Sequence, residues 1–322
     1  MSSNALAVSV VYPLQIRHPD VVVPFAEFVL RSGAERLWLG QSLNVDTHLA
    51  AAYLAGRGLR VPMGSSVTLL PLRHPYQAAV EARSLAVLTG RPYVAGFGAG
   101  DPEFTANLAG RPYRSPRRAV EEYLSAVRAL LDGRAVEHEG EHFTVHGMLL
   151  PAEHPGVEVG AGVLRPMMAR TAGAVADVAI TWLVPAGYLG GVLLPALRAG
   201  AQGRPRPPRV VSVVHVAVER PGRDIGRLVR VATGAHLEAG HYADMLRRAG
   251  VELAGLGPAD VSRALLDAGA FVAGKPDEIA AELRRFHEAG ADEVVLNSCG
   301  VLATEGPGAA LADLADVLAA LE

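Results

Sequence analysis

The feature that most constrains the fold of this 322-residue chain is the regular alternation of strand-like and helix-like segments along its length. Short runs rich in β-branched residues alternate with segments in which apolar residues recur every three or four positions. Such alternation builds a parallel sheet with helices packed against it. The expected strands are Ala7–Val11, Leu37–Leu39, Val61–Thr68, Tyr93–Phe97, Val157–Gly160, Ala179–Trp182, Val210–Val218 and Glu293–Asn297.

Eight such strands without an internal boundary predict an α/β fold, a single (β/α)₈ TIM barrel that occupies residues 1–322 as one domain. A small insertion with a hairpin is expected after the fourth helix, in residues 133–155, and extra helices before the eighth strand, in residues 234–274. An open doubly wound sheet is the alternative. The main helices are expected at Asp20–Arg31, Thr47–Gly56, Pro75–Leu88, Pro116–Leu131 and Ala309–Leu321.

Composition narrows the classes of partner. The net charge is −3 with both signs interspersed, which is not the pattern of a nucleic-acid-binding protein. The single cysteine, Cys299, excludes an intramolecular disulfide, and no spaced set of Cys and His predicts a metal site. The N-terminal segment lacks the basic start of a signal peptide, and the uncharged stretch Val178–Leu197 is interrupted by proline and glycine. We expect a cytoplasmic protein that does not bind membranes.

In parallel barrels the chemistry lies at the carboxyl ends of the strands. The third strand ends in Ser66 and Val67, where small residues would let a flat ring approach the backbone, although an ordinary strand end is an equal alternative. In the fourth strand Gly96, Gly98 and Gly100 alternate, so one face carries no side chain and either a helix or a ligand ring should lie against it.

Two charged residues follow these strand ends. Asp101 precedes a proline and either directs its carboxylate into the barrel mouth or caps a turn or helix. After the fifth strand, Gly162 leads into a helix that begins near Arg165, where free amides, the helix dipole and the guanidinium would favour a phosphate. The alternative is a tight turn whose arginine faces solvent. No nucleophile motif accompanies these residues, so a cofactor would supply the chemistry.

Five segments, in this order, resemble the luciferase-like monooxygenase superfamily, and the resemblance covers nearly the whole chain. It is closest to the branch that uses the deazaflavin coenzyme F420. The segments are LWLGQSLNVDTHLAAAYLAG, GSSVTLLPLRHPYQAAVEA, AGFGAGDPEF, RPMMARTAGAVADVAITWLVPAGYL and VAGKPDEIAAELRRFHEAGADEVVLN. Each is loose alone, but five in the correct order are specific.

The resemblance implies a cofactor that lies across the strand ends, with its phosphate at the fifth strand. The ring would pack near the Ser66–Val67 bond, which several relatives hold in the cis form. Asp101 stands where related dehydrogenases carry a glutamate, and it is the candidate proton donor. The implied cofactor-binding residues are Gln41, Ser66, Val67, Gly98, Gly100, Gly162, Val163, Leu164 and Arg165. The implied substrate pocket contains Tyr12, His74 and Trp182.

Two departures from the family pattern limit this interpretation. Gln41 and Ser42 stand where some deazaflavin dehydrogenases carry an Asp-His pair, which argues against a sugar-phosphate dehydrogenase. Leu164 and Arg165 replace the usual glycines of the phosphate turn.

The activity implied by the resemblance is hydride transfer between reduced F420 and a C=C or C=N bond of a small-molecule or peptide substrate. The alternatives are an FMN-dependent monooxygenase served by a separate flavin reductase, and a non-catalytic flavin-binding homologue. Members of the superfamily are often dimers, so a homodimer is also expected.

Overall fold

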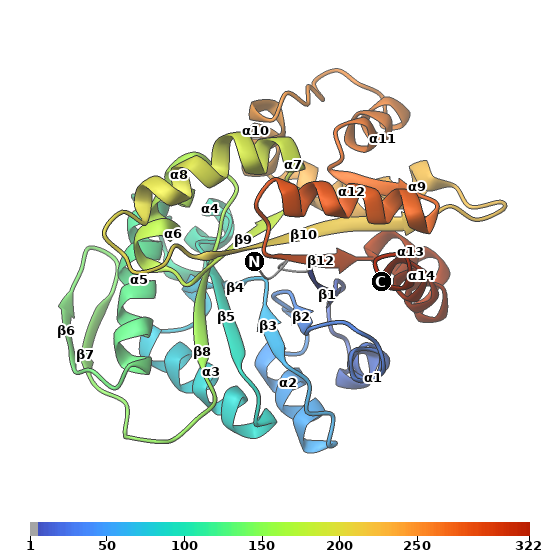
Figure 1. Ribbon diagram of the computed structural model, residues 1–322. Coiled ribbons are helices and arrows are strands. Elements are labelled where there is room, and N and C mark those ends of the chain that lie inside the picture. Colours follow the sequence, from blue (N-terminus) through green and yellow to red (C-terminus); the bar gives the residue numbers. More distant parts are fainter. Residues whose placement is uncertain (1–5) are drawn as a thin grey trace.

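The computed structural model describes residues 6–322; residues 1–5, part of the segment considered above as a possible leader, lie outside the described part. Within the described residues, eight parallel strands form a closed barrel (Figure 1). These strands are β1 Ala7–Tyr12, β2 Leu37–Leu39, β3 Met63–Ser65, β5 Tyr93–Gly98, β8 Val157–Gly162, β9 Val178–Trp182, β10 Arg209–Val218 and β12 Glu293–Asn297.

The strand order proves that the barrel is closed. Neighbours follow the order β10, β12, β1, β2, β3, β5, β8 and β9, and β9 pairs in parallel with β10 again. The closing register runs from Arg209 opposite Val178 to Val213 opposite Trp182. The predicted TIM barrel is therefore confirmed, and the open doubly wound sheet is wrong.

Helices surround the barrel on its outer face (Figure 1). Asp46 caps α2 by accepting the N–H groups of His48 and Leu49, and Ser115 caps α5, which has Pro116 at its first position, as predicted. The helices outside the later insertion are α1 Val23–Arg31, α2 Thr47–Gly56, α3 Pro75–Thr89, α4 Pro102–Ala109, α5 Pro116–Leu131, α6 Pro166–Val175, α7 Ala186–Tyr188, α8 Leu194–Gly200, α12 Pro276–Glu288, α13 Cys299–Glu305 and α14 Pro307–Ala319.

The predicted hairpin after α5 is confirmed. Strands β6 (Val136–Glu139) and β7 (Thr144–Gly147) pair antiparallel outside the barrel. The buried carboxylate of Glu122 on α5 accepts backbone N–H groups from His142 at 2.9 Å and Phe143 at 3.3 Å. These bonds fix the hairpin loop to α5.

The second insertion differs from the prediction. Residues 234–274 were expected to be helical, and they do contain the end of α9 (Ile225–Glu238), α10 (Gly240–Arg248) and α11 (Pro258–Asp267). They end, however, in strand β11 (Phe271–Gly274), which pairs with the last four residues of β10 beyond the point where β9 stops. The third expected strand is also divided, because after β3 only the two-residue β4 (Thr68–Leu69) returns to pair with β5.

The barrel interior is filled by one apolar cluster. Glycines make room for its largest members: the Trp38 ring lies against Gly64, and Ile180 lies over Gly96 and Gly160. The indole N–H of Trp38 donates to the buried carboxylate of Glu293. The cluster consists of Val11, Trp38, Val94, Val178, Ile180, Val211, Val213 and Val295.

The uncharged segment Val178–Leu197 forms β9 and the short helical stretch that ends in α8. Among residues 6–322, no helix combines the length and the apolar character needed to cross a bilayer.

Candidate active site at the barrel mouth

The inward-facing residues at the carboxyl ends of the strands divide the barrel mouth into two contrasting halves. Side chains alternate along a strand, so the position two residues beyond each interior residue also points inward. On the exits of β2, β3, β5 and β8 these positions hold Gly40, Ser66, Gly98 and Gly162, which we call the glycine side. On β9, β10 and β12 they hold Trp182, His215 and Asn297, which we call the aromatic side.

Val67 covers the glycine side. A Cβ atom at Gly98 would lie 2.8 Å from Val67 Cγ2, and one at Gly162 would lie 3.5 Å from Val67 Cγ1. The spaced glycines therefore accommodate a side chain from the neighbouring strand exit, rather than the helix or ring that the sequence suggested for Gly98. Gly98, Gly162 and Val67 are only partly buried, so a bound molecule can reach this surface. The Ser66–Val67 bond is cis, as the resemblance implies.

Gln41 joins two strand exits on the glycine side. Its side-chain oxygen accepts the N–H of Leu69 in β4 at 3.2 Å, and its amide nitrogen donates to the Ser42 carbonyl at 2.8 Å. Both ends of the amide are thus engaged by backbone. Gln41 fixes the position of β4 beside β5 and contributes a polar wall to the mouth.

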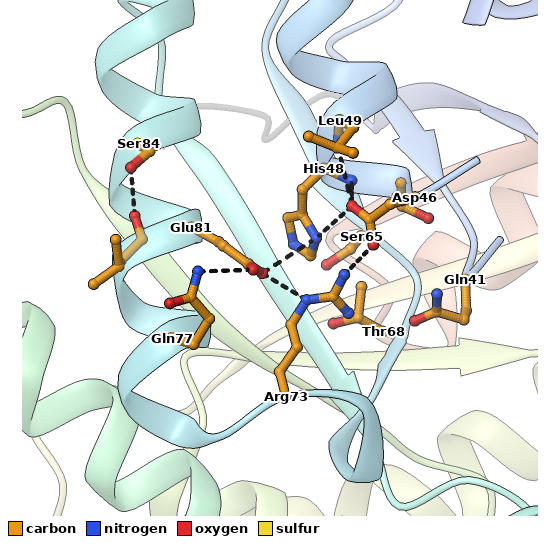
Figure 2. A network of polar contacts seen from close by, with 12 residues as sticks. Gln41, Asp46, His48, Leu49, Ser65, Thr68, Arg73, Gln77, Glu81 and Ser84 are labelled. Carbon is orange, nitrogen blue, oxygen red and sulfur yellow. Dashed lines mark hydrogen bonds and ion pairs between the residues drawn. The ribbon is translucent and has the colours of Figure 1, made fainter. Parts of the chain in front are cut away.

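A charged network behind β3 holds the same exits from outside the barrel (Figure 2). The Arg73 guanidinium lies between Asp46 at the start of α2 and Glu81 on α3, at 2.6 Å from Glu81. His48 lies beside both carboxylates, at 3.6 and 3.5 Å. Burial by itself raises the pKa of Asp46, but the hydrogen bond from His48 and the charge of Arg73 hold that pKa well below its usual range. This network positions the loop that carries Val67.

Asp101 follows β5 and caps α4. Its carboxylate accepts the N–H of Glu103 at 2.8 Å and of Phe104 at 3.3 Å, which is the cap that the sequence allowed as an alternative. The residue is half-buried, so the carboxylate is still reachable. Burial lowers the pKa of His241 on α10; the charge of Asp101 raises this pKa, and that of Arg165 lowers it. His241 therefore lies within electrostatic reach of both strand exits.

The exit of β8 forms an uncapped helix start. No side chain caps α6, and among residues 6–322 the amides of Leu164 and Arg165 have no hydrogen-bond acceptor. Val163 was expected to contribute as well, but its N–H donates to the Ile180 carbonyl at 2.7 Å and its side chain is buried in the core. Val163 is therefore unavailable to a ligand, because the strand pairing, which was predicted to end at Gly160, continues through β8 to Val163.

Positive charge gathers beside this helix start. Half-exposed Arg165 lies 3.5 Å from Asp244 on α10, and Arg247 and Arg248 each bind the same carboxylate at 2.9 Å. Three guanidinium groups thus share one aspartate. The hydroxyl of buried Tyr188 has no partner within the described residues. Burial raises the pKa of this hydroxyl, although the charges of Arg248 and Arg165 nearby act in the opposite direction.

Two residues assigned to the substrate pocket lie elsewhere. Tyr12 follows inward-facing Val11, so it points outward and packs edge-on against Phe25 of α1, with ring centroids 5.3 Å apart. His74 caps α3, and its Nε2 lies 2.9 Å from the Thr144 carbonyl in the hairpin. Both predictions were wrong. Trp182 does lie at the mouth, on top of the interior cluster.

The structure adds residues that the sequence reasoning missed. His215 is fully buried on β10, stacks on Phe271 of β11 at 5.9 Å, and meets Trp182 edge-on at 5.8 Å. His236 of α9 stacks on Trp182 at 5.6 Å and meets Tyr242 of α10 at 5.0 Å. The signal was the position of His215, which follows Val211 and Val213 at every second residue and so shares their inward face near the end of an apolar strand.

Comparison with known proteins decides the family. The model of the luciferase-like monooxygenase family matches residues 7–293, nearly the whole chain. The chain belongs to the luciferase-like monooxygenase family. It is accordingly an enzyme of the luciferase-like oxidoreductases and monooxygenases.

Relatives of this luciferase-like enzyme carry different activities. The chain is 28% identical over 171 residues to 4-hydroxyprotoasukamycin monooxygenase of Streptomyces nodosus subsp. asukaensis, covering 50% of this chain and 46% of the relative. The chain spans about half the length of the curated relatives it matches.

Solved structures show the same fold at low identity. An F420-dependent secondary alcohol dehydrogenase in complex with an F420-acetone adduct superposes with a TM-score of 0.74, at 17% identity over 99% of both chains. The oxygenating constituent of 3,6-diketocamphane monooxygenase of Pseudomonas putida, in complex with FMN, gives 0.70 at 17% identity, over 97% of this chain and 98% of that one.

Proposed function

We propose that this luciferase-like enzyme transfers a hydride between reduced coenzyme F420 and a C=C or C=N bond of an organic substrate. The observation that carries the proposal is the uncapped start of α6 beside Arg165 and the Tyr188 hydroxyl. Unsatisfied amides, a helix dipole and guanidinium groups together favour a phosphate. The half-exposed glycine side lies on the same rim, where a phosphorylated flat ring would reach it.

The residues present fit such a ring. Val67 gives an apolar surface beside Gly98 and Gly162, which have no side chains to cover it, and Gln41 borders this surface. Gly100, at a φ of +80°, adopts the left-handed conformation that favours glycine, directly before Asp101. The reduced deazaflavin supplies the hydride when bound. The phosphate would be held by the amides of Leu164 and Arg165 and by the Arg165 guanidinium.

Asp101 is the proposed proton donor, directly or through water. Its carboxylate is reachable and lies within electrostatic reach of His241. The rings of the aromatic side would exclude water from the reacting carbon. Neither role requires a metal.

The test is a fluorescence titration of the purified protein with F420 and, separately, with FMN. The proposal expects tight binding of F420. Binding of FMN alone would support the monooxygenase alternative, in keeping with the monooxygenase relative, and binding of neither would favour a non-catalytic homologue.

A matched pair of variants tests the phosphate anchor. Arg165→Ala should weaken F420 binding about tenfold, because a charge-assisted contact is lost, and should leave binding of the dephosphorylated deazaflavin unchanged. Arg170→Ala, on the exposed face of the same helix, is the control and should change neither. Equal effects on the phosphorylated and dephosphorylated forms would refute the anchor.

A further inference from the structure

The hydrogen-bond network of the aromatic side determines which nitrogen of His215 carries the proton. The side-chain oxygen of Asn297 accepts the N–H of Cys299 at 2.9 Å, so the amide nitrogen of Asn297 must face His215. That nitrogen lies 3.1 Å from His215 Nε2 and can only donate to it. Burial lowers the pKa of His215 to about 3, so the ring is neutral and has a single proton. The proton is therefore on Nδ1.

Two buried donors result from this arrangement. His215 Nδ1 and the indole nitrogen of Trp182 are both inaccessible to solvent and have no acceptor within residues 6–322. The other tryptophan shows the usual arrangement, because Trp38 donates to Glu293 at 2.8 Å. Buried donors without an acceptor are rare and unfavourable in folded proteins. Two of them in rings that touch each other indicate that an acceptor belongs there.

The surroundings indicate an uncharged acceptor. The rings packed around these donors are those of Phe271, His236 and Tyr242, and no Lys or Arg of the described residues stacks on them or forms an ion pair with them. A carboxylate would therefore lose its hydration without gaining a counter-charge. A carbonyl oxygen has two lone pairs and can accept both N–H groups.

We propose that the aromatic side of the mouth binds the carbonyl oxygen of a neutral, largely apolar substrate, with the N–H groups of His215 and Trp182 as donors. Trp182 is partly exposed, so the substrate enters from the mouth and passes the indole ring. His215 and Trp182 are thus specificity-determining residues. Asn297 is a positioning residue that fixes the tautomer of His215.

This inference deepens the proposed function and rests on it for the reaction. A carbonyl conjugated to the C=C bond defines the substrate class, an α,β-unsaturated carbonyl compound. A hydride with its electron pair adds to the β-carbon, and the π electrons of the C=C bond move toward the carbonyl oxygen, where the two N–H groups stabilise the charge. A proton from Asp101, the proposed donor, would then add at the α-carbon, with the hydride and its two electrons supplied by the reduced deazaflavin.

The recognition step can be tested without any cofactor. The chain contains only two tryptophans, so an ¹⁵N-correlated NMR spectrum contains two indole signals, which Trp182→Phe assigns. Acetophenone is the probe, and α-methylstyrene, which has the same shape with a CH₂ group in place of oxygen, is its control. We expect acetophenone to shift the Trp182 indole signal downfield and to leave that of Trp38 in place. It should bind about tenfold more tightly than α-methylstyrene.

Variants of both donors separate recognition from packing. His215→Phe keeps a ring on Phe271, and Trp182→Phe keeps a ring on His236; each should reduce the preference for acetophenone severalfold and leave α-methylstyrene binding unchanged. Equal binding of the two probes, or binding of neither, to the unmodified protein overturns the proposal. Because F420 binding is measured separately, its failure rejects the proposed function while a Trp182 shift would still support carbonyl recognition.

Discussion

Gly98→Ala tests whether the glycine side is shaped by Val67. The new Cβ would lie 2.8 Å from Val67 Cγ2, at least 0.6 Å inside the ordinary contact distance of 3.4 Å. Val67 is β-branched and stiff, and its other methyl group already lies beside Gly162, so it cannot simply rotate away. Overpacking of this kind costs about 1–3 kcal/mol, and the loss of glycine freedom in the unfolded chain returns about 0.4–1 kcal/mol.

The expected net result is a decrease of about 1–2 kcal/mol in the free energy of unfolding, measured by urea denaturation. Gly162→Ala is the matched control, because its Cβ would make only an ordinary contact at 3.5 Å; it should be neutral or slightly stabilising. Val67→Ala should remove most of the difference between the two glycine variants. If Gly98→Ala and Gly162→Ala agree within about 0.5 kcal/mol, the reasoning is refuted.

Three further predictions concern the site. Arg73→Met should lower the free energy of unfolding by about 2–3 kcal/mol in urea denaturation, because two partly buried carboxylates lose their shared cation; an unchanged midpoint would contradict this. Asp101→Asn keeps the helix cap, so its stability should change by less than about 0.5 kcal/mol, whereas its turnover should fall at least tenfold if Asp101 donates a proton. Burial depresses the pKa of His215 from 6.5 to about 3, so the unfolded chain takes up a proton that the folded chain does not. As the pH is lowered from about 6 to 3, the free energy of unfolding should therefore decrease more steeply for the unmodified protein than for His215→Gln, by up to about 1.4 kcal/mol per pH unit. Equal slopes for the two proteins would show that His215 titrates normally.

The strands of this barrel could be predicted because their apolar runs are long and separated by clear helical periods. The direction of individual side chains could not be predicted for the same reason. In β1 the residues on both faces are buried, so alternation shows that Val11 and Tyr12 oppose each other but not which one faces inward. His215 in β10 poses the same difficulty.

Other features depend on contacts between distant segments. The uncapped start of α6 could be anticipated from Gly162 and Pro166, but the approach of Asp244 to Arg165 joins residues 79 positions apart. β11 is four residues long and is stabilised by pairing with β10, so its short apolar run did not distinguish it from the preceding helices. The role of His74 as a cap was readable from the proline that follows it, and the resemblance to a family motif obscured it.

The extra strand β11 has a consequence for how this enzyme can diversify. Because β10 continues beyond β9 and pairs there with β11, the segment from α9 to β11 is anchored at its end to the barrel by backbone hydrogen bonds that do not depend on side chains. Substitutions or insertions in this segment can therefore reshape one rim of the mouth while the opposite rim keeps its geometry. If the coenzyme lies on the glycine side, as proposed, exchange of this segment would change the choice of substrate and leave coenzyme binding intact.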